Sequence, residues 1–349
     1  MRRLILILLL VSCSVPAVEI PPEQDFILWD IISEDTPDTK ALVNSYVTLR
    51  DACTQDDDGA EKIGLWGSYT LDGTTETVFS DDDLWWWEKE DGNPFNDVLG
   101  NPSMWNYEGE GRRWVTGADY VFRAYFPKSM ITLQPGSDVD RFLVVYDTQV
   151  SQFDMMVASR TLKAGAENPV KLVFGHALSA IKFDFQFVED GVEDKLTACW
   201  LENAGSGGFY TSSTLNYESS VAWPVSTSYP VGNRMYYWEP EVPLQVGSGT
   251  ASAAYTSSAA SESGDIYTAN EGWILVIPQK LNGPDALKLC FKTETGGESV
   301  FSVGLPEKEL EAGYRYTFHI KISSTSIDLA LTIADWNERK SSHQIDLNE

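Results

Sequence analysis

Hydrophobic and polar residues alternate with a period of two along much of the chain. The clearest run is Ile181 to Phe187, in which every second residue is large and apolar, while Lys182 and Asp184 lie on the other face. The same alternation marks three further segments, residues 287–292, 314–322 and 327–333. Because successive side chains of a β-strand point to opposite faces, this pattern predicts strands with one face on a core and one face in water.

Other segments in the first half of the chain predict strands of a second kind. The sequences "YVFRAYFP" and "RFLVVYD" are apolar on both faces, which is typical of strands covered on both sides. After the first twelve residues, no window of a dozen residues carries the 3.6-residue stripe of an amphipathic helix. Two stretches of small polar residues, 205–220 and 247–265, are predicted to be surface loops. Many short strands between turn residues indicate an all-β chain built of β-sandwiches.

Chain length sets the expected number of domains. The chain has 349 residues, and a domain has about 150, so two sandwiches in tandem are expected. Composition shifts near residues 161–170, where small and polar residues replace the apolar runs. We therefore predict an N-terminal domain over residues 41–165 and a C-terminal domain over residues 166–349.

The N-terminus has the features of an export signal. Two arginines precede an apolar run from Leu4 to Val11, which is too short for the roughly 20 residues that span a bilayer as a helix. We interpret residues 1–12 as a signal peptide. Leu10 to Cys13 resembles the lipobox of bacterial lipoproteins, which implies cleavage before Cys13 and acylation of its thiol with palmitate or a related chain. An ordinary signal peptide followed by an unmodified cysteine is the alternative.

Charge narrows the classes of partner. The formal net charge is −27, and removal of residues 1–12 with their two arginines makes it −29. So acidic a protein repels nucleic acid, and nucleic-acid binding is therefore excluded as a function. Without Cys13, three cysteines remain, so at least one is free or pairs between chains. A bridge between Cys199 and Cys290 is compatible with the sequence, whereas no cysteine or histidine cluster predicts zinc.

Candidate catalytic chemistry is sparse. His176 has the same parity as Phe174 and Leu178, so we predict a buried side chain with one hydrogen-bond partner. No GxSxG or HExxH motif is present, and we expect neither an enzyme nor a cofactor. The acidic run after Thr54 fails as a calcium loop, because the first and twelfth positions, Thr54 and Leu65, cannot act as ligands. A solvated turn is expected there and at residues 81–83.

Three consecutive tryptophans, Trp85, Trp86 and Trp87, form the most unusual stretch. They cannot all face one side of a strand. Together with aromatic residues that follow in the sequence, they are candidates for a platform that binds a glycan. Core or interface packing is the alternative, because each ring buries a large area.

Several strand segments occur in an order that resembles the fimbrillin family, the subunits of type V pili and related surface lipoproteins of Bacteroidales-type bacteria. The resemblance spans residues 39–336 and rests on "YVFRAYFP", "FDMMVASR", "VKLVFGHALSAIKFDF", "WILVIPQ", "ELEAGYRYTFHIKI" and "LALTIADW". It implies two transthyretin-like Greek-key β-sandwich domains and secretion as a lipidated precursor. It also implies assembly by strand exchange, in which proteolysis removes an N-terminal strand and a neighbouring subunit supplies its replacement.

The resemblance implies that processing removes an N-terminal leader, residues 13–40. The candidate cut follows Lys40, where the family often has arginine, and Arg50 is the second candidate. Alternatively neither is cut, and residues 26–50 form a permanent first strand. The segment from Ile327 onward is the candidate donor strand, and its alternative is the final strand of its own domain.

Two classes of function remain from the sequence. The first is a structural or adhesive subunit of a cell-surface fimbria, anchored by lipid to the outer membrane at least as a precursor, with other fimbrial subunits as partners. Its place in the shaft, at the tip or at the anchor stays open. The second is a surface lipoprotein that binds a glycan or host ligand without polymerising.

Overall fold

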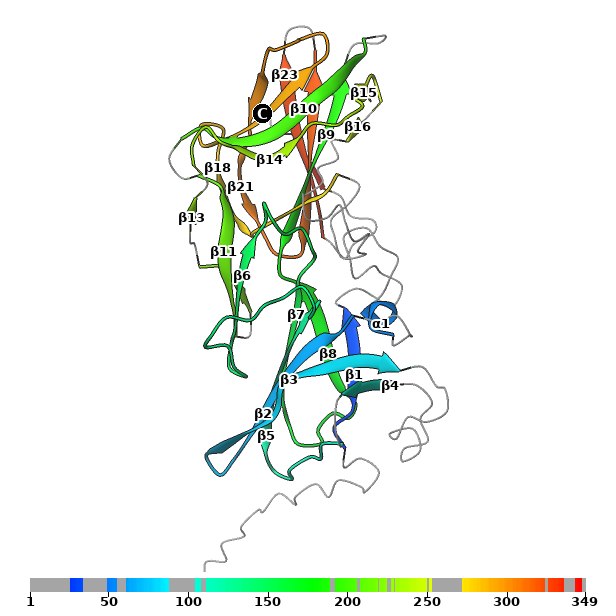
Figure 1. Ribbon diagram of the computed structural model, residues 1–349, viewed down its shortest axis with the longest axis vertical. Coiled ribbons are helices and arrows are strands. Elements are labelled where there is room, and N and C mark those ends of the chain that lie inside the picture. The colour runs from blue at the N-terminus through cyan, green and yellow to red at the C-terminus, as the bar shows by residue number, and fades with distance from the viewer. Residues whose placement is uncertain are drawn as a thin grey trace, which may run out of the picture.

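The molecule is elongated, with two groups of β-sheets arranged one above the other (Figure 1). The structure is a computed structural model. It describes residues 26–33, 49–54, 61–87, 104–107, 111–188, 192–205, 208–218, 220–224, 227–228, 230–249, 251–252, 272–323, 326–335 and 343–346. In these residues the only helix is the short α1 (Leu49–Ala52), and strands make up the rest of the regular structure. The prediction of an all-β fold is confirmed. Within these residues, no helix has the length and apolar character needed to cross a bilayer.

The lower group in Figure 1 is built on a seven-stranded sheet. All of its neighbouring strands pair antiparallel except β1 and β8, which are parallel. In order across the sheet, its strands are β1 (Trp29–Ser33), β8 (Val170–His176), β7 (Met156–Lys163), β5 (Asp119–Phe126), β2 (Ile63–Leu71), β3 (Thr74–Trp87) and β4 (Met104–Tyr107). A second sheet places β11 (Tyr210–Tyr217) between β6 (Phe142–Asp147) and the short strands β12 (Val221–Ala222) and β13 (Thr227–Ser228).

The upper group consists of two facing sheets and a small ribbon. The six-stranded sheet contains β16 (Ala251–Ser252), β17 (Ile274–Val276), β9 (Ser179–Phe187), β22 (Tyr314–Ile322), β23 (Ile327–Asp335) and β24 (His343–Asp346). The five-stranded sheet contains β14 (Arg234–Trp238), β15 (Leu244–Val246), β10 (Asp194–Asn203), β19 (Leu287–Thr293) and β20 (Phe301–Gly304). The ribbon pairs β18 (Gln279–Asn282) with β21 (Glu307–Leu310).

Each group of sheets has its own hydrophobic core. The first contains the buried aromatic residues of β3, β5 and β6, and the second contains those of β9, β19 and β22. The two cores divide inside β9, because Ala180 belongs to the first and Ile181 to the second. β11 also contributes to the first core, so the chain returns to it after β9 and β10. The domain limits 41–165 and 166–349 stay a prediction, since the cores partition the strands differently.

Two glycines of β2 allow large aromatic rings to cover that strand. A Cβ atom on Gly67 would lie 2.7 Å from the Phe122 ring, and one on Gly64 would lie 2.3 Å from the Tyr125 ring. Side chains at these two positions would push the rings out of a close-packed core. The first core therefore depends on glycine where its rings approach the β2 backbone.

One segment predicted to be a loop is a strand. Residues 205–220 contain β11, which pairs along six residues with β6. The buried face of β11 begins with Thr211 and Ser213 and continues with Leu215 and Tyr217. The Ser213 hydroxyl donates a hydrogen bond to the carbonyl of Pro224 at 2.7 Å. The loop prediction is wrong because small polar residues, satisfied by hydrogen bonds, occupy part of an inward face.

The three cysteines within the described residues are free and buried. Cys199 packs in the second core, whereas Cys290 lies against Trp200 on the opposite face of the same sheet. A Cys199–Cys290 bridge is therefore not formed. Burial raises the pKa of the Cys199 thiol well above its usual range and that of Cys290 to about 11. Both thiols are thus protonated and unreactive at neutral pH.

Buried hydrogen bonds join the loop after β6 to strands of the upper group. The hydroxyl groups of Thr148 and Tyr236 are 2.6 Å apart, and the Thr148 hydroxyl lies 2.9 Å from the carbonyl of Thr211. Gln152 donates to the carbonyl of Leu275 at 3.0 Å and accepts from its amide at 2.7 Å. Because these groups are buried and paired, they fix β14 and β17 relative to the first core.

We expect Tyr236→Phe to lower the free energy of unfolding by about 1–2 kcal/mol, because it leaves the buried Thr148 hydroxyl with one partner fewer. Urea denaturation followed by circular dichroism measures the change. The matched control is Tyr237→Phe, since Tyr237 is exposed on the same strand. Equal effects of both substitutions would contradict a structural role for the buried pair.

Candidate functional site

The first strand of the structure lies at one edge of the seven-stranded sheet. β1 pairs in parallel with β8, from Trp29 opposite Val170 to Ser33 opposite Phe174. In Figure 1 it lies beside β8 and close to α1. In the sequence, β1 precedes both candidate processing sites, Lys40 and Arg50.

Alternation along β1 explains its burial. Ile27, Trp29 and Ile31 point inward and are at most 8% exposed, whereas Asp30 is exposed. The Trp29 indole meets the rings of Phe79 and Phe122 edge-on, at 5.5 and 4.9 Å between centroids. Burying an aromatic or branched side chain contributes roughly 1.5–3 kcal/mol, so three inward residues hold β1 against the core.

Polar contacts fix the entry of β1 into the sheet. The side chain of Asn168 accepts from the amide of Leu28 at 3.0 Å and donates to the carbonyl of Phe26 at 2.9 Å. On the other side, the amide of Ile27 donates to the carbonyl of Arg112 at 2.8 Å. The segment before and within β1 is therefore bonded to the chain on both flanks.

Arg50, the second candidate for processing, lies inside α1. Its guanidinium carbon is 4.3 Å from the centroid of the Trp86 ring, and its carbonyl accepts from the Thr54 hydroxyl at 2.8 Å. Its neighbours Leu49 and Cys53 are buried. Lys40, the first candidate, and Cys13, the predicted lipidation site, lie outside the described residues.

The tryptophans of β3 are divided between different surroundings. Trp86 packs edge-on against Trp105 of β4 at 5.6 Å, and Arg50 covers its ring. The Nζ atom of Lys62 is 5.9 Å from the ring of Trp85, which projects to the other face of the strand. The side chain of Trp87 lies outside the described residues. The glycan platform formed by all three rings stays a prediction, and packing accounts for the position of Trp86.

Three consecutive aspartates, residues 81–83, lie within β3, so the prediction of a solvated turn there is wrong. Asp81 has a φ of 61° and occupies a bulge opposite β2. Lysine and arginine side chains neutralise the three carboxylates. The ion pairs are Lys128–Asp83 at 2.7 Å, Lys62–Asp83 at 2.5 Å, Arg112–Asp82 at 2.5 Å and Lys128–Asp81 at 3.5 Å.

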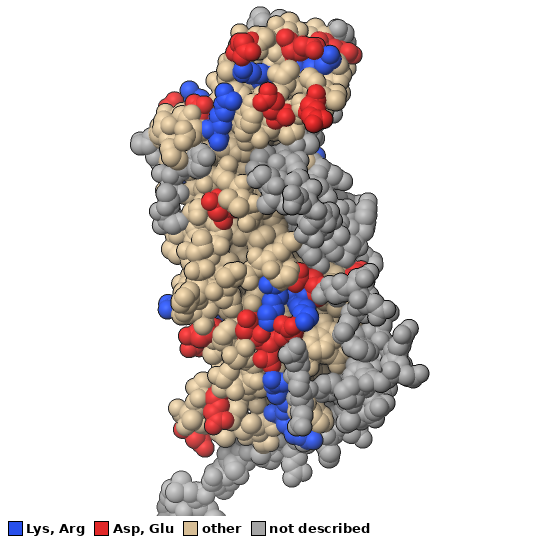
Figure 2. All heavy atoms as spheres, in the orientation of Figure 1, with Lys and Arg blue, Asp and Glu red and all other residues tan. Residues whose placement is uncertain are grey.

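Each carboxylate of this cluster is paired with a lysine or arginine side chain. Burial raises the pKa of Asp83, but hydrogen bonds from Lys128 and Lys62 outweigh burial, and the pKa lies below its usual value. Figure 2 shows mixed acidic and basic side chains on the lower half of the molecule. Among the residues described above, no group of histidine, cysteine and acidic side chains could hold a metal ion.

His176 is buried, and its Nδ1 atom is 3.0 and 2.9 Å from the two carboxylate oxygens of Asp154, which is also buried. The prediction of a buried histidine with a hydrogen-bond partner is confirmed. Asp154 lies between β6 and β7, and His176 is the last residue of β8.

The segment from Ile327 onward is paired in this structure. β23 pairs with β22 along its whole length, and β24 pairs with residues 330–333 of β23. This matches the alternative in which the segment completes its own domain. Of β23 and β24, only β24 lies at the edge of the sheet.

Comparisons with known proteins agree with this architecture. The sequence pattern of a family described as fimbrillin-like matches residues 54–336. A fimbrial protein from Bacteroides vulgatus ATCC 8482 has a similar fold, with a TM-score of 0.55 and 15% identity over 89% of this chain and 99% of that chain. A protein from Bacteroides uniformis ATCC 8492 that is assigned to cell adhesion has a TM-score of 0.51 and 14% identity over 90% and 99%. No curated protein matches the sequence.

Proposed function

The chain belongs to the fimbrillin-like family, and from this premise we propose that it is a structural or adhesive subunit of a cell-surface fimbria. The observation that carries the proposal is β1, a short edge strand that fills an apolar groove and precedes both candidate cleavage sites. Such a strand can be removed by proteolysis and replaced by a strand from another subunit.

Removal of β1 would expose both a sheet edge and apolar side chains. Val170, Leu172 and Phe174 of β8 are fully buried with β1 in place, as are Phe79 and Phe122 beneath Trp29. The edge of β8 would then present unpaired amide and carbonyl groups. An extended segment with alternating apolar and polar residues would pair with the backbone groups of β8 and cover the exposed apolar side chains, which is β-augmentation. A trimmed subunit is therefore an acceptor for a donor strand.

Lys40 is the better candidate for processing. Cleavage after Arg50 would cut through α1, and it would detach Leu49 from the core and Arg50 from Trp86. Proteases cut segments that can unfold locally at little cost. Cleavage after Lys40 removes β1 and leaves α1 in place. A protease that accepts lysine would therefore mature this subunit.

The donor is most simply the C-terminal segment that contains β24. β23 lies between β22 and β24, so its withdrawal would open the second core beside Leu329 and Leu331. β24 is at the sheet edge and pairs with only four residues. Its release therefore costs fewer contacts than release of β23.

Export as a lipoprotein completes the proposal. Acylation at Cys13 would tether the precursor to the outer membrane, because two or more acyl chains give stable attachment. Cleavage after Lys40 would then release the subunit from its anchor and open its groove in a single step. A subunit that keeps residues 13–40 would stay attached and end the polymer.

Limited proteolysis tests the proposal. Residues 14–349 are treated with a lysine-specific protease and analysed on SDS gels without boiling. We expect ladders of oligomers that resist SDS. The chain with Lys40→Gln is the matched control and should stay monomeric, whereas Arg50→Gln should still polymerise.

A synthetic peptide of residues 26–34 sharpens this experiment. It should refill the groove of the trimmed chain and suppress the ladder, because it supplies Trp29 and Ile31. The same peptide with aspartate in place of both residues should have no effect. Trimmed protein that stays monomeric without peptide would contradict strand exchange and favour the surface lipoprotein that does not polymerise.

A further inference from the structure

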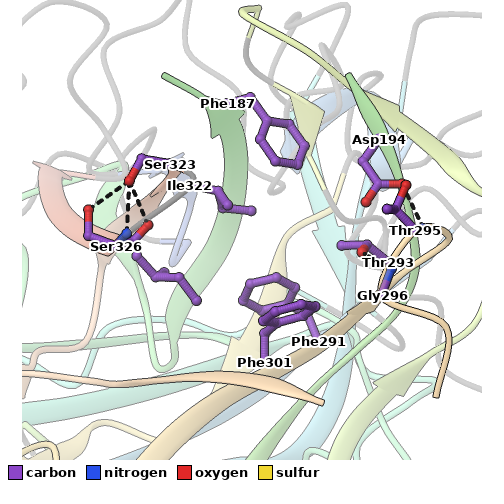
Figure 3. Close-up of a pocket in the computed structure, with 11 residues that line it drawn as sticks. Phe187, Asp194, Phe291, Thr293, Thr295, Gly296, Phe301, Ile322, Ser323 and Ser326 are labelled. Carbon is purple, nitrogen blue, oxygen red and sulfur yellow. Dashed lines mark hydrogen bonds between the residues drawn. The ribbon is translucent and has the colours of Figure 1, made fainter. Parts of the chain in front are cut away.

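A cavity of about 460 Å³ lies at the end of the second sandwich (Figure 3). β9 starts in the first core and runs away from it, so Phe187 at its end marks the far end of the molecule. The cavity opens between the β19–β20 side of one sheet and the β22–β23 side of the other. Its volume is in the range of sites that bind small molecules, which span about 300–1,000 Å³.

The floor of the cavity is aromatic. Phe291 and Phe301 stack with 5.6 Å between their centroids and an angle of 24° between their planes. Phe187 faces them across the opening, and Ile322 and Ile327 complete the apolar wall (Figure 3). Phe301 is 38% exposed, whereas Phe291 is buried. An apolar ligand can therefore reach the stacked pair from solvent.

Asp194 provides the charge in this cavity. Its Oδ1 atom accepts from the amide of Lys195 at 2.8 Å and from the amide and hydroxyl of Thr295, both at 3.1 Å. Burial raises the pKa of Asp194, but these bonds and the Thr293 hydroxyl outweigh burial and hold the pKa below its usual value. The carboxylate is therefore ionised at neutral pH and oriented by the turn that follows β19.

Nearby lysines are engaged with other partners. Lys195 pairs with Glu294 at 2.9 Å, and Lys292 pairs with Glu298 at 2.7 Å. Within the described part of the chain, no lysine or arginine forms an ion pair with Asp194, and no basic residue lines the cavity. The opposite rim carries the hydroxyl groups of Ser323 and Ser326. The cavity thus combines aromatic walls with one uncompensated negative charge.

We propose that this cavity is a binding site for a small organic ammonium ion with an aromatic or aliphatic body. The body would lie against Phe291 and Phe301, and the ammonium group would approach the carboxylate of Asp194. Burial of the apolar body against the two rings favours binding, and the carboxylate adds a charge-assisted hydrogen bond to the ammonium group. The strongly negative protein also raises the local concentration of cations. The inference does not depend on strand exchange, because the cavity lies far from β1.

Titration of residues 14–349 with 2-phenylethylamine, followed by NMR, tests the site. We expect saturable binding in the millimolar range with shifts at residues of the cavity. The alcohol of the same shape, 2-phenylethanol, should bind about tenfold more weakly, because it lacks the charge. Phenylacetate, which has the opposite charge, should not bind.

Two substitutions separate the aromatic and ionic contributions. Phe301→Ala should weaken amine and alcohol alike by about tenfold, and Asp194→Asn should weaken only the amine by a similar factor. Val242→Ala, at a position that is 80% exposed and outside the cavity lining, should change neither. Thermal melting checks that each variant folds.

The outcomes are decisive even if Asp194→Asn unfolds. The comparison of amine with alcohol and the effect of Phe301→Ala do not require that variant. Equal binding of the alcohol or the acid, an unchanged affinity of Phe301→Ala, or no saturable amine binding would each overturn the proposal.

Discussion

Replacing Trp29 by alanine is expected to lower the free energy of unfolding of the uncut chain by about 3–5 kcal/mol. Trp29 is 5% exposed and packs edge-on against Phe79 and Phe122. Its loss leaves a cavity beneath an edge strand that has a single ladder of five residues. Denaturation in urea, followed by circular dichroism, measures the change.

Asp30→Ala is the matched control for this prediction. Asp30 lies on the same strand and is exposed, so its replacement should stay within about 0.5 kcal/mol. If both substitutions lower the free energy of unfolding by similar amounts, burial of the Trp29 indole does not explain the loss.

The same variant has a functional consequence. A strand that is held less tightly should exchange with a competitor, so the uncut Trp29→Ala chain should take up a labelled peptide of residues 26–34. The unmodified chain should exclude that peptide until it is cleaved. If the unmodified chain takes up the peptide equally before and after cleavage, the groove that β1 fills is not the site where the peptide binds.

The second large effect is expected at the buried pair of His176 and Asp154. Asp154→Ala should cost about 3–5 kcal/mol of unfolding free energy, because it leaves the buried imidazole without its carboxylate partner. The pair is held at 2.9–3.0 Å with both side chains buried. Urea denaturation of the single variants measures each loss.

The double replacement Asp154→Leu with His176→Phe tests whether the two buried polar side chains depend on each other for their contribution to stability. Apolar side chains of similar volume remove the penalty of burying polar groups, so the double variant should lose much less than the sum of the single variants. Additive losses would show that the two side chains act independently.

The period-two pattern predicted individual strands well. Of the segments that alternate in the sequence, residues 314–322 coincide with β22, and residues 181–187 lie within β9. Alternation reports the strand and its inward face, and both follow from local chain geometry. It does not report which strands pair. The parallel pairing of β9 with β22 joins residues more than a hundred positions apart, and only packing selects it.

Buried polar residues limited what could be predicted. Ser213 and Gln152 are buried, and hydrogen bonds satisfy their side chains. A hydrophobicity pattern assigns such residues to the surface. For this reason the sequence predicted a loop where β11 lies. The buried hydrogen bonds of Thr148 and Gln152 could not be predicted from the sequence either. Asp81, Asp82 and Asp83 were missed as strand residues because their neutralising lysines and arginine come from distant segments.

For the candidate sites, the sequence identified individual residues, whereas the fold determined which of them lie together. The sequence identified Arg50 and the tryptophans of β3 as separate features. The fold places the Arg50 guanidinium on the Trp86 ring, which makes cleavage there costly and gives that ring a packing role. Nothing in the sequence marked Asp194 and Phe301 as parts of one cavity, because strand pairing and the turn after β19 bring them together.

By itself, the sequence determined that the chain folds into β-strands, which side of many strands faces a core, and that the chain carries a large negative charge. These properties depend on side-chain alternation and total charge, which are local or additive. The tertiary structure decided that β1 fills an edge groove, that the cores divide inside β9, and where a small cation could bind. These properties depend on contacts between distant segments, which alternation along the chain does not encode.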